Sequence, residues 1–248
     1  MSIDDDRDLE ALRAAGRVVR LALEAMSDAV APGVSTARLD AIAGEIFRAH
    51  GARSAPRLVY DFPGETCISL NDEIVHGIPS VRRVLADGDL VKLDVTAELG
   101  GYMADAAVTR AVGRANDRAL KLTACAEAAF RRAMREVRPG RRVCDVGGAV
   151  EAEVRRRGFS VVRTLTGHGI GHTIHEDPMV PNWFDPTARE WLTEGLVITV
   201  EPIIAMGSGE SYEDADGWTI RTLDGTLSAH FEHTLVVTKG SPLLLTAA

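Results

Sequence analysis

The sequence predicts an α+β fold in which a curved antiparallel sheet, built from two similar halves, carries its helices on the outside. Apolar residues recur at helical spacing at the start of each half, and strand-like segments follow them. The same order of elements returns after 107 residues, as an internal duplication would produce. We therefore expect a single domain over residues 1–248, with pseudo-repeats at roughly 7–112 and 116–238 related by a pseudo-twofold axis.

The first half should contain two helices followed by strands. A helix over about the first 30 residues ends at Pro32-Gly33. Ser35 is placed to cap a second helix, and Gly51 suits the left-handed position that follows its end. A loop through Pro56 and Pro63 then leads into the strands, which are expected at residues 66–70, 90–96 and 103–112.

The second half repeats this order. Asn116 should cap a third helix that runs to Val137, before a break at Pro139-Gly140. A fourth helix is expected over residues 144–157, closed by Gly158. The rest of the chain is predicted to be strand and loop.

A single offset of 107 residues relates the two halves. It carries the first Pro-Gly break onto the second, Gly51 onto Gly158 and Asp94 onto Glu201. A single matching helix cap could arise by chance, so the evidence for a duplication is that several positions match at one offset. Each half therefore carries an acidic residue on a strand, and a pseudo-twofold axis would bring the two together.

Asp94 and Asp105 are the first acidic pair. Residues 91–96 alternate apolar and polar, which places Asp94 on the face opposite the core. Pairing Asp94 directly with Asp105 centres the turn between Leu99 and Gly100 and sets the two side chains about 5 Å apart. Such a buried pair needs a shared proton or a cation, and the pair alone leaves both readings open.

Glu201 and Glu232 form a similar arrangement. They interrupt apolar strands expected over residues 196–204 and 229–237, and pairing them places the midpoint of the connection at Asp216-Gly217. Four acidic residues thus interrupt four apolar strands. This recurrence favours a site over solvated strand faces.

A glycine-rich loop over residues 166–178 carries His168, His172 and His175. No phosphate-binding Lys or amphipathic helix follows it, and Met179 stands where a His-Glu-x-x-His zinc motif needs its second His. One imidazole with four carboxylates favours Mn, Fe(II), Co or Mg over a structural tetrahedral zinc. Four carboxylates also suffice to bridge two ions about 3.5–4 Å apart, as in two-metal hydrolysis.

The composition excludes other classes. A net charge of -8 argues against nucleic-acid recognition, and Arg131-Arg132 and residues 155–157 are interpreted as solvated helix faces. Three cysteines make no disulfide framework, and the acidic N-terminus is unlike a signal peptide. No apolar run is long enough to span a membrane. We therefore expect a cytoplasmic protein.

With these residues in place, the chain resembles the type I methionine aminopeptidases, which have the pita-bread fold. The resemblance covers nearly the whole chain and implies one catalytic domain. Its most specific stretches are residues 67–79, 93–96, Asp105, 167–178, 200–202 and 231–234.

The resemblance implies a dinuclear site holding two divalent ions, with Co, Mn, Fe(II) and Zn all left open. Asp94 would chelate one ion, His168 with Glu201 would hold the other, and Asp105 and Glu232 would bridge them. A metal-bridging water would attack the carbonyl of the methionine residue, with Glu201 as general base and acid.

The resemblance also implies the substrate contacts. His175 would stabilise the oxyanion and His76 would contact the scissile-side nitrogen, while Phe62, Cys67 and Trp218 would line an apolar methionine pocket. Cys67 as a nucleophile is the alternative to a soft pocket wall. The implied substrates are nascent chains and peptides with N-terminal Met and a small second residue. Transient ribosome association and a monomer are expected, without direct nucleic-acid recognition or a membrane.

Three positions depart from the family pattern. Ile174 stands where Phe is frequent, Val59 where Tyr is frequent, and Val75 where Cys is common. These departures bear on the shape of the methionine pocket and leave the metal ligands untouched.

Three rival functions remain at this point. An Xaa-Pro peptidase of the same fold would share the five metal ligands, although such enzymes usually carry an extra N-terminal domain. A non-catalytic peptide-binding module of this fold would typically have lost some ligands. A two-metal phosphodiesterase fits the carboxylates but not the -8 charge.

Overall fold

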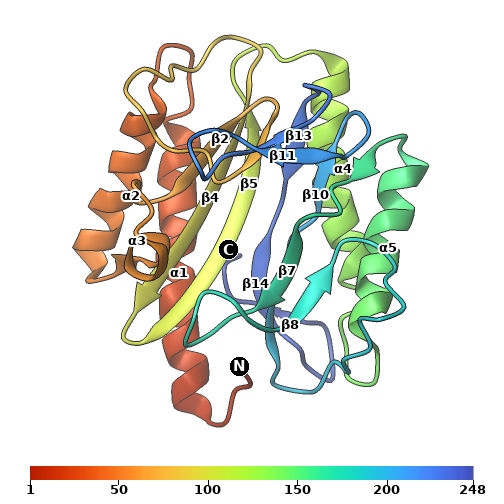
Figure 1. The fold of residues 1–248 in the computed structure, drawn as a ribbon. Coiled ribbons are helices and arrows are strands. Elements are labelled where there is room, and N and C mark those ends of the chain that lie inside the picture. The colour runs from red at the N-terminus through yellow and green to blue at the C-terminus, as the bar shows by residue number, and fades with distance from the viewer. Residues whose placement is uncertain (248) are drawn as a thin grey trace.

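The computed structural model describes residues 1–247, in which antiparallel strands are flanked by helices on both sides (Figure 1). The helices are α1 (Asp6–Asp28), α2 (Thr36–His50), α3 (Ala55–Tyr60), α4 (Asp117–Ala133) and α5 (Val143–Arg156). The strands of the first half are β1 (Arg53–Ser54), β2 (Cys67–Leu70), β3 (Glu73–Val75), β4 (Leu90–Leu99) and β5 (Tyr102–Ala111). Those of the second half are β6 (Ser160–Val161), β7 (Thr166–Gly169), β8 (Glu176–Pro181), β9 (Val197–Val200), β10 (Ile203–Ala205), β11 (Ser211–Glu213), β12 (Ile220–Thr222), β13 (Ser228–His230), β14 (His233–Val236) and β15 (Leu243–Leu244).

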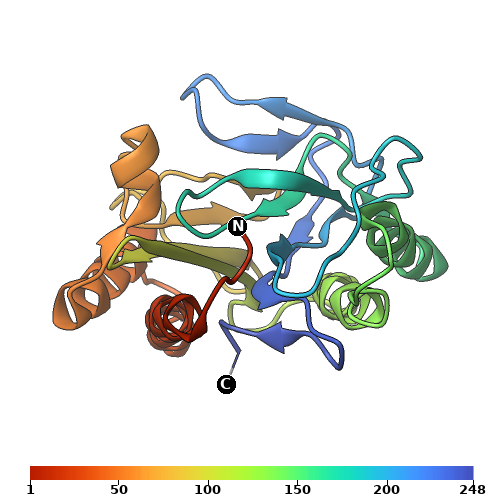
Figure 2. The ribbon, with the colours of Figure 1, turned by 90° about the horizontal axis from the view of Figure 1, so that it is seen from below.

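Each half carries its own pair of long helices on the outside of its strands (Figure 1). Helix α1 packs on β4 and β5, and α2 packs on α1, β1 and β2, while α4 and α5 pack on strands of the second half. Seen from below, α1 and α4 lie on one side of the strands and the β11–β12 hairpin lies on the other (Figure 2). Each half has its own apolar core, and Phe231 packs against both cores. The predicted α+β fold is therefore confirmed.

Most predicted helix limits are confirmed. The Ser35 hydroxyl accepts a hydrogen bond from the Arg38 amide, and Gly51 follows α2 with a left-handed φ of 67°. Helices α2 and α5 begin at Thr36 and Val143, which differ by the same offset of 107. The internal duplication itself stays a prediction.

Two helix predictions were wrong. The third helix ends at Ala133 rather than Val137, because the amides of Arg135 and Glu136 bond to carbonyls three residues back and tighten the chain into a turn. The expected loop through Pro56 contains the short helix α3, which Ser54 caps and whose first turn accommodates the proline.

The predicted register of the β4–β5 hairpin was also wrong. Asp94 pairs with Ala107, and Asp105 pairs with Thr96. The reason is the turn, in which Gly100 and Gly101 both adopt positive φ and form a two-residue connection. The true register differs from the predicted one by two residues, so both aspartates still lie on the same face.

The predicted pairing in the second half is confirmed, although its two long strands are each split in two. The same register joins His233 to Val200, Ile203 to His230 and Ser211 to Thr222. Strand β9 stops at Val200 and β10 starts at Ile203, because the intervening Pro202 has no amide hydrogen for a ladder. The opposite strand is interrupted at the same level, where β13 ends at His230 and β14 starts at His233.

The glycine-rich segment was expected to be a loop, but its first part forms β7. A Cβ on Gly167 would lie 2.7 Å from the Thr199 carbonyl oxygen, and one on Gly169 would lie 2.2 Å from the Asp177 oxygen. These glycines therefore permit close approach of neighbouring strands rather than a turn.

Threonine side chains join β5 to the strands of the second half. Thr234 Oγ1 accepts from the Asp105 amide and donates to the Asp105 carbonyl, both at 2.8 Å. Thr109 Oγ1 makes the same pair of bonds to His230, again at 2.8 Å. Between them, the Glu232 amide donates to the Ala107 carbonyl. We call this set of contacts the threonine seam.

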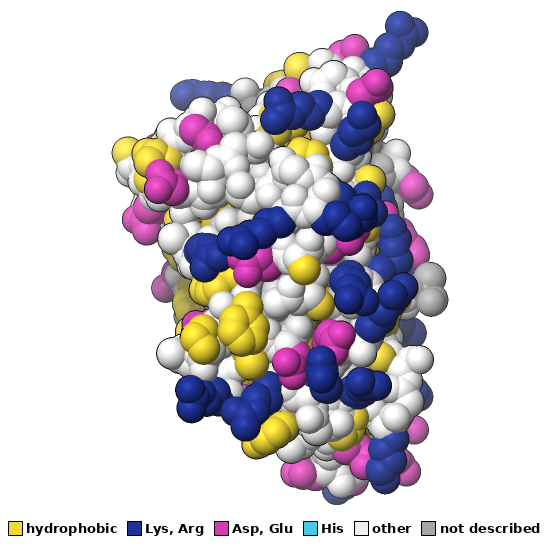
Figure 3. All heavy atoms as spheres, turned by 90° about the vertical axis from the view of Figure 1, so that its right-hand side faces the viewer, with side chains coloured by type: hydrophobic (Ala, Val, Ile, Leu, Met, Phe, Trp, Pro, Cys, Tyr) yellow, Lys and Arg dark blue, Asp and Glu magenta, His cyan; other side chains and the backbone are white. Residues whose placement is uncertain are grey.

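The arginine clusters lie on an exposed face. Figure 3 faces the side of the molecule that carries α4 and α5, where Lys and Arg side chains gather among acidic ones. Arg131 pairs with Glu127, Arg155 with Glu151, and both Arg156 and Arg157 with Glu153. No helix within residues 1–247 combines the length and apolar character needed to cross a bilayer.

The threonine seam should contribute measurably to stability. Thr234→Val keeps the side-chain volume but leaves the buried Asp105 amide and carbonyl without partners, so we expect a loss of about 2–4 kcal/mol. Urea unfolding of both proteins with a chelator present measures this loss in the free energy of unfolding.

A matched control is Thr123→Val in α4, where the lost bond goes to a helical carbonyl. It should cost less than about 1 kcal/mol. Equal losses in both variants would contradict the role of the seam.

Candidate metal centre

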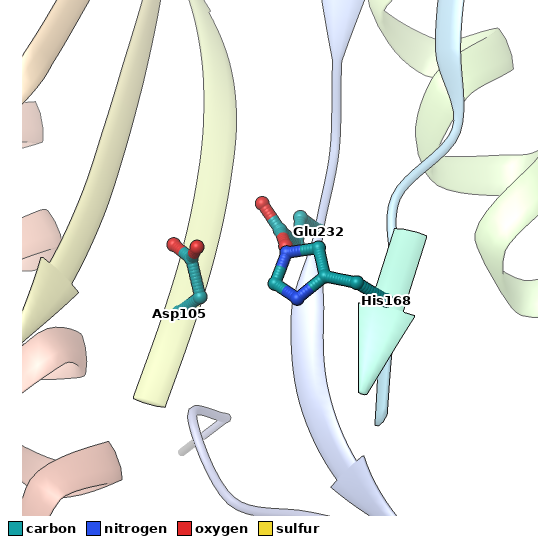
Figure 4. Close-up of side chains that lie close together, drawn as sticks. All are labelled: Asp105, His168 and Glu232. Atoms are coloured by element: carbon teal, nitrogen blue, oxygen red, sulfur yellow. The ribbon is translucent and has the colours of Figure 1, made fainter. Parts of the chain in front are cut away.

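Four carboxylates and one imidazole converge between the two halves. Asp94 lies on β4 and Asp105 on β5, while Glu201 and Glu232 occupy the breaks that follow β9 and β13. His168 lies on β7. Figure 4 shows Asp105, Glu232 and His168 approaching one another from three separate segments. The strand breaks place Glu201 and Glu232 at the point where the halves meet, and the Glu232 backbone pairs there with Ala107 of β5.

Two adjoining cavities lie at this point, and together they include every predicted site residue. The smaller, of about 100 Å³, is lined by Val75, His76, Asp94, Asp105, Leu165, Thr166, His168, His175, Glu201, Ile203, His230 and Glu232. The larger, of about 260 Å³, is lined by Pro56, Tyr60, Phe62, Cys67, His76, Asp94, Thr96, Asp105, Ile174, His175 and Trp218.

The His168 ring is oriented for metal ligation. Its Nδ1 is 2.8 Å from the Gly169 carbonyl oxygen, which can only accept, so the proton lies on Nδ1 and the lone pair on Nε2. That Nε2 lies 3.6 Å from Glu201 Oε1. Burial lowers the pKa of His168 to about 3, which keeps the ring neutral and able to ligate.

Thr199 holds Glu201 and His168 together. Its hydroxyl donates to Glu201 Oε1 at 3.0 Å and accepts from the His168 amide at 3.1 Å. The hydroxyl thus fixes one carboxylate oxygen of Glu201. This arrangement is typical of a partner that orients a metal ligand.

The carboxylates cannot all be ionised in the absence of a cation. Burial, with the charge of Asp105 next, raises the pKa of Asp94 to about 8. Burial and neighbouring carboxylates raise the pKa values of Asp105, Glu201 and Glu232 well above their usual range.

The donor atoms fit divalent ions. Among the described residues, Asp105 Oδ1 and Glu232 Oε1 are buried without a hydrogen-bond partner. Two groups bring one ligand atom per residue within 4.8 Å of each other: Asp105, His168 and Glu232, and then Glu201, His230 and Glu232. Unpaired buried oxygens next to a neutral imidazole satisfy the requirements of a cation site.

Two further histidines face both cavities. His76 adopts a left-handed φ of 58°, and Gly77 beside it has no room for a Cβ, which would lie 2.3 Å from the Ile68 oxygen. Burial, with His175 next, lowers the pKa of His76 to about 4, and burial also lowers the pKa of His175. Both rings are therefore neutral near pH 7.

The larger cavity has apolar walls. Phe62 and Trp218 meet edge to face with ring centroids 5.1 Å apart. Burial raises the pKa of the Cys67 thiol well above its usual value, which favours a pocket wall over a nucleophile. Ile174 is buried in the lining, whereas Val59 is exposed and does not line the cavity.

Two residues at this site were missed from the sequence. Tyr60 lines the larger cavity and its hydroxyl lies 2.6 Å from His175 Nδ1. His230 lines the smaller cavity beside Glu232. In the strand predicted over residues 229–237, the two-residue spacing of His230 and Glu232 indicates a shared face and could have revealed His230.

The family follows from comparison with known proteins. The family model described as metallopeptidase family M24 matches residues 10–239. The chain belongs to this family. Methionine aminopeptidase 2 of Bacillus subtilis (strain 168) is 44% identical over 247 residues, covering 99% of each chain. The Aquifex aeolicus methionine aminopeptidase is 37% identical over 97% of this chain and 96% of its own.

Solved structures of family members share the fold. The methionine aminopeptidase from Thermotoga maritima superposes with a TM-score of 0.97 at 33% identity, covering all of both chains. A prolidase from Pyrococcus furiosus superposes with a TM-score of 0.80 at 22% identity, covering 99% of this chain and 65% of its own. The pita-bread fold is therefore confirmed, and the prolidase comparison bears on the fold alone.

Metal binding should release protons. Because the pKa of Asp94 is about 8 and those of its neighbours are also raised, these carboxyls retain protons below that pH, and a cation must displace them. Affinity for Mn²⁺ should therefore rise between pH 6 and 8, about tenfold per pH unit for each proton released.

Calorimetric titration in buffers of different ionisation enthalpy measures the release. Asp94→Asn, which lacks one of the titrating carboxyls, should release fewer protons at pH 7. An affinity independent of pH, without proton release, would contradict the electrostatics described above.

Proposed function

We propose that this metallopeptidase is a methionine aminopeptidase that removes the N-terminal methionine from proteins with a small second residue. One observation carries the proposal: the cavity with the metal-ligating groups opens directly onto the apolar pocket. His76, His175, Asp94 and Asp105 line both. A side chain bound in the pocket therefore lies next to the groups that hydrolyse its peptide bond. The relatives named methionine aminopeptidase support the same substrate.

Asp94, Asp105, His168, Glu201 and Glu232 would hold two divalent ions, whose identity stays open. Such ions lower the pKa of water and polarise a carbonyl. The protein must then move the proton. Glu201 suits this role because its Oε1 is held by Thr199, and because burial raises the affinity of its carboxylate for a proton. It would take the proton from the attacking water and deliver it to the leaving amine.

His175 would donate a hydrogen bond to the carbonyl oxygen as negative charge develops. Burial raises the pKa of Tyr60, so its phenol stays protonated and can donate a hydrogen bond to His175 Nδ1. The proton of the neutral imidazole is then on Nε2, directed away from Tyr60. Tyr60 acts through His175 and is therefore a positioning residue. His76 would contact the scissile-side nitrogen.

The pocket walls suit an unbranched thioether. Phe62 and Trp218 offer aromatic contacts to sulfur, and Cys67 adds a soft surface. Ile174 makes this wall aliphatic. We also propose that the enzyme works in the cytoplasm as a monomer on nascent chains, with transient ribosome contact.

An Xaa-Pro peptidase is the competing function. Its solved representatives share the fold with this chain at 20–22% identity, well below the relatives named methionine aminopeptidase. The aromatic and aliphatic walls of the larger cavity also favour methionine.

Peptide assays distinguish these functions. Purified protein with Mn²⁺ or Co²⁺ should release methionine from Met-Ala-Ser and leave Leu-Ala-Ser and Ala-Pro peptides intact, and a chelator should abolish release. Preference for Ala-Pro would overturn the assignment. Absence of turnover with every metal would indicate a binding module instead.

Glu201→Gln should lower kcat by at least about 10²-fold, because the amide cannot accept the proton. Glu213→Gln, which changes an exposed carboxylate on β11, should leave kcat unchanged and serves as the control. Comparable activity in both variants would rule out Glu201 as the proton carrier.

Tyr60→Phe should lower kcat about 2–10-fold, which corresponds to one neutral hydrogen bond of about 0.5–1.5 kcal/mol. His175→Ala should cost about 10²–10³-fold. Since Tyr60 acts through His175, adding Tyr60→Phe to His175→Ala should have no further effect on kcat. Additive losses would instead show that Tyr60 acts separately.

A further inference from the structure

His230 is a buried histidine without a hydrogen-bond partner. His230 is 2% exposed, and among the described residues neither its Nδ1 nor its Nε2 has a hydrogen-bond partner. Leaving a buried polar atom unsatisfied costs about 1–3 kcal/mol. A histidine that served only to fill the core would be expected to bond through at least one ring nitrogen, as His233 does with Thr246.

The ring nevertheless points at two of the carboxylates. Nε2 lies 3.3 Å from Glu232 Oε2 and 3.7 Å from Glu201 Oε2. Two atoms that bind a common ion at about 2.1 Å lie about 3.0–3.4 Å apart in tetrahedral or octahedral geometry. The three side chains thus have nearly the spacing of ligands around a shared cation.

A direct hydrogen bond from the ring to a glutamate is the simplest alternative. Nε2 lies 3.3 Å from Glu232 Oε2 but has no hydrogen-bond partner among the described residues. A cation held between the ring and the two carboxylates would satisfy this nitrogen and offset the charge of both glutamates.

The backbone around His230 is fixed. Thr109 holds both its amide and its carbonyl through the threonine seam. Ser228, two residues before His230, is also held in place. Its Oγ accepts a hydrogen bond from the buried Lys92 ammonium at 3.1 Å, and the same ammonium donates to the Asn71 carbonyl at 2.7 Å. Strand β13 is therefore tied to both β4 and β5, which carry the aspartates, and the imidazole is pre-organised for a ligand.

We propose that His230 is a metal ligand, which binds one of the two divalent ions through Nε2 together with Glu201 and Glu232. The inference rests on the proposed function only in assuming that the site holds two ions. It changes the donor set from one imidazole to two, with four carboxylates. A second nitrogen donor shifts preference from Mg²⁺ and Mn²⁺ towards Co²⁺, Fe²⁺ and Zn²⁺.

Cobalt titration of the metal-free protein tests the proposal without an activity measurement. In His230→Gln, one of the two Co²⁺ ions should bind at least about tenfold more weakly, as expected when a ligand contact is lost. The visible absorption of that ion should also change. The matched control is His233→Gln, which alters a partly buried histidine that directly follows Glu232 and bonds to Thr246, and it should leave both affinities and the spectrum unchanged.

X-ray absorption of the unaltered protein loaded with two Zn²⁺ ions gives a second readout that requires no folded variant. Two imidazoles shared by two ions support the proposal, and one imidazole overturns it. Wild-type Co²⁺ affinity and spectrum in His230→Gln would likewise overturn it. If the unaltered protein binds two ions but releases no methionine, the proposed function fails while the His230 assignment stands.

Discussion

Mutual repulsion among four clustered carboxylates, three of them buried and Asp94 partly buried, governs the architecture of this protein. Two unit charges 4 Å apart repel by about 4 kcal/mol at an effective dielectric constant near 20, and Asp105, Glu201 and Glu232 are each less than one-tenth exposed. Such a cluster persists only with protons or cations inside it. The rest of the fold holds the four groups together against this repulsion. The threonine seam bonds to the backbone of Asp105, Glu232 and His230, and the Thr199 hydroxyl bonds to Glu201.

The carboxylate cluster could be anticipated from the sequence because strand periodicity is local information. The β4–β5 register was wrong by two residues, yet Asp94 and Asp105 kept their common face, since only an odd slip moves a side chain to the other side. The continuous register from Val197 to Val236 was predicted because the acidic residues mark it and Asp216-Gly217 forms its turn. The carboxylate cluster therefore followed from alternation and glycine placement, whereas the ligand roles came from the family resemblance.

Other features depended on contacts between distant segments. The glycines of β7 resemble loop glycines in sequence, and only the proximity of Thr199 and Asp177 reveals why a Cβ is excluded. Tyr60 reaches His175 because α3 turns the chain, and the proline in that segment obscured the helix. His230 was overlooked because its neighbours in space were not known when its strand was interpreted. Substrate-pocket residues were suggested by family resemblance rather than by periodicity.

The threonine seam has a consequence for how the active centre forms during folding. Its Asp105–Thr234 contact closes a loop of 129 residues, and contacts across such separations form slowly because chain entropy must first be overcome. Neither half alone contains all the proposed ligands, since Asp94 and Asp105 lie before the link between β5 and α4 and the other proposed ligands follow it. The proposed metal centre can therefore form only after both halves have been synthesised and joined. A partly folded chain would lack the complete set of proposed ligands.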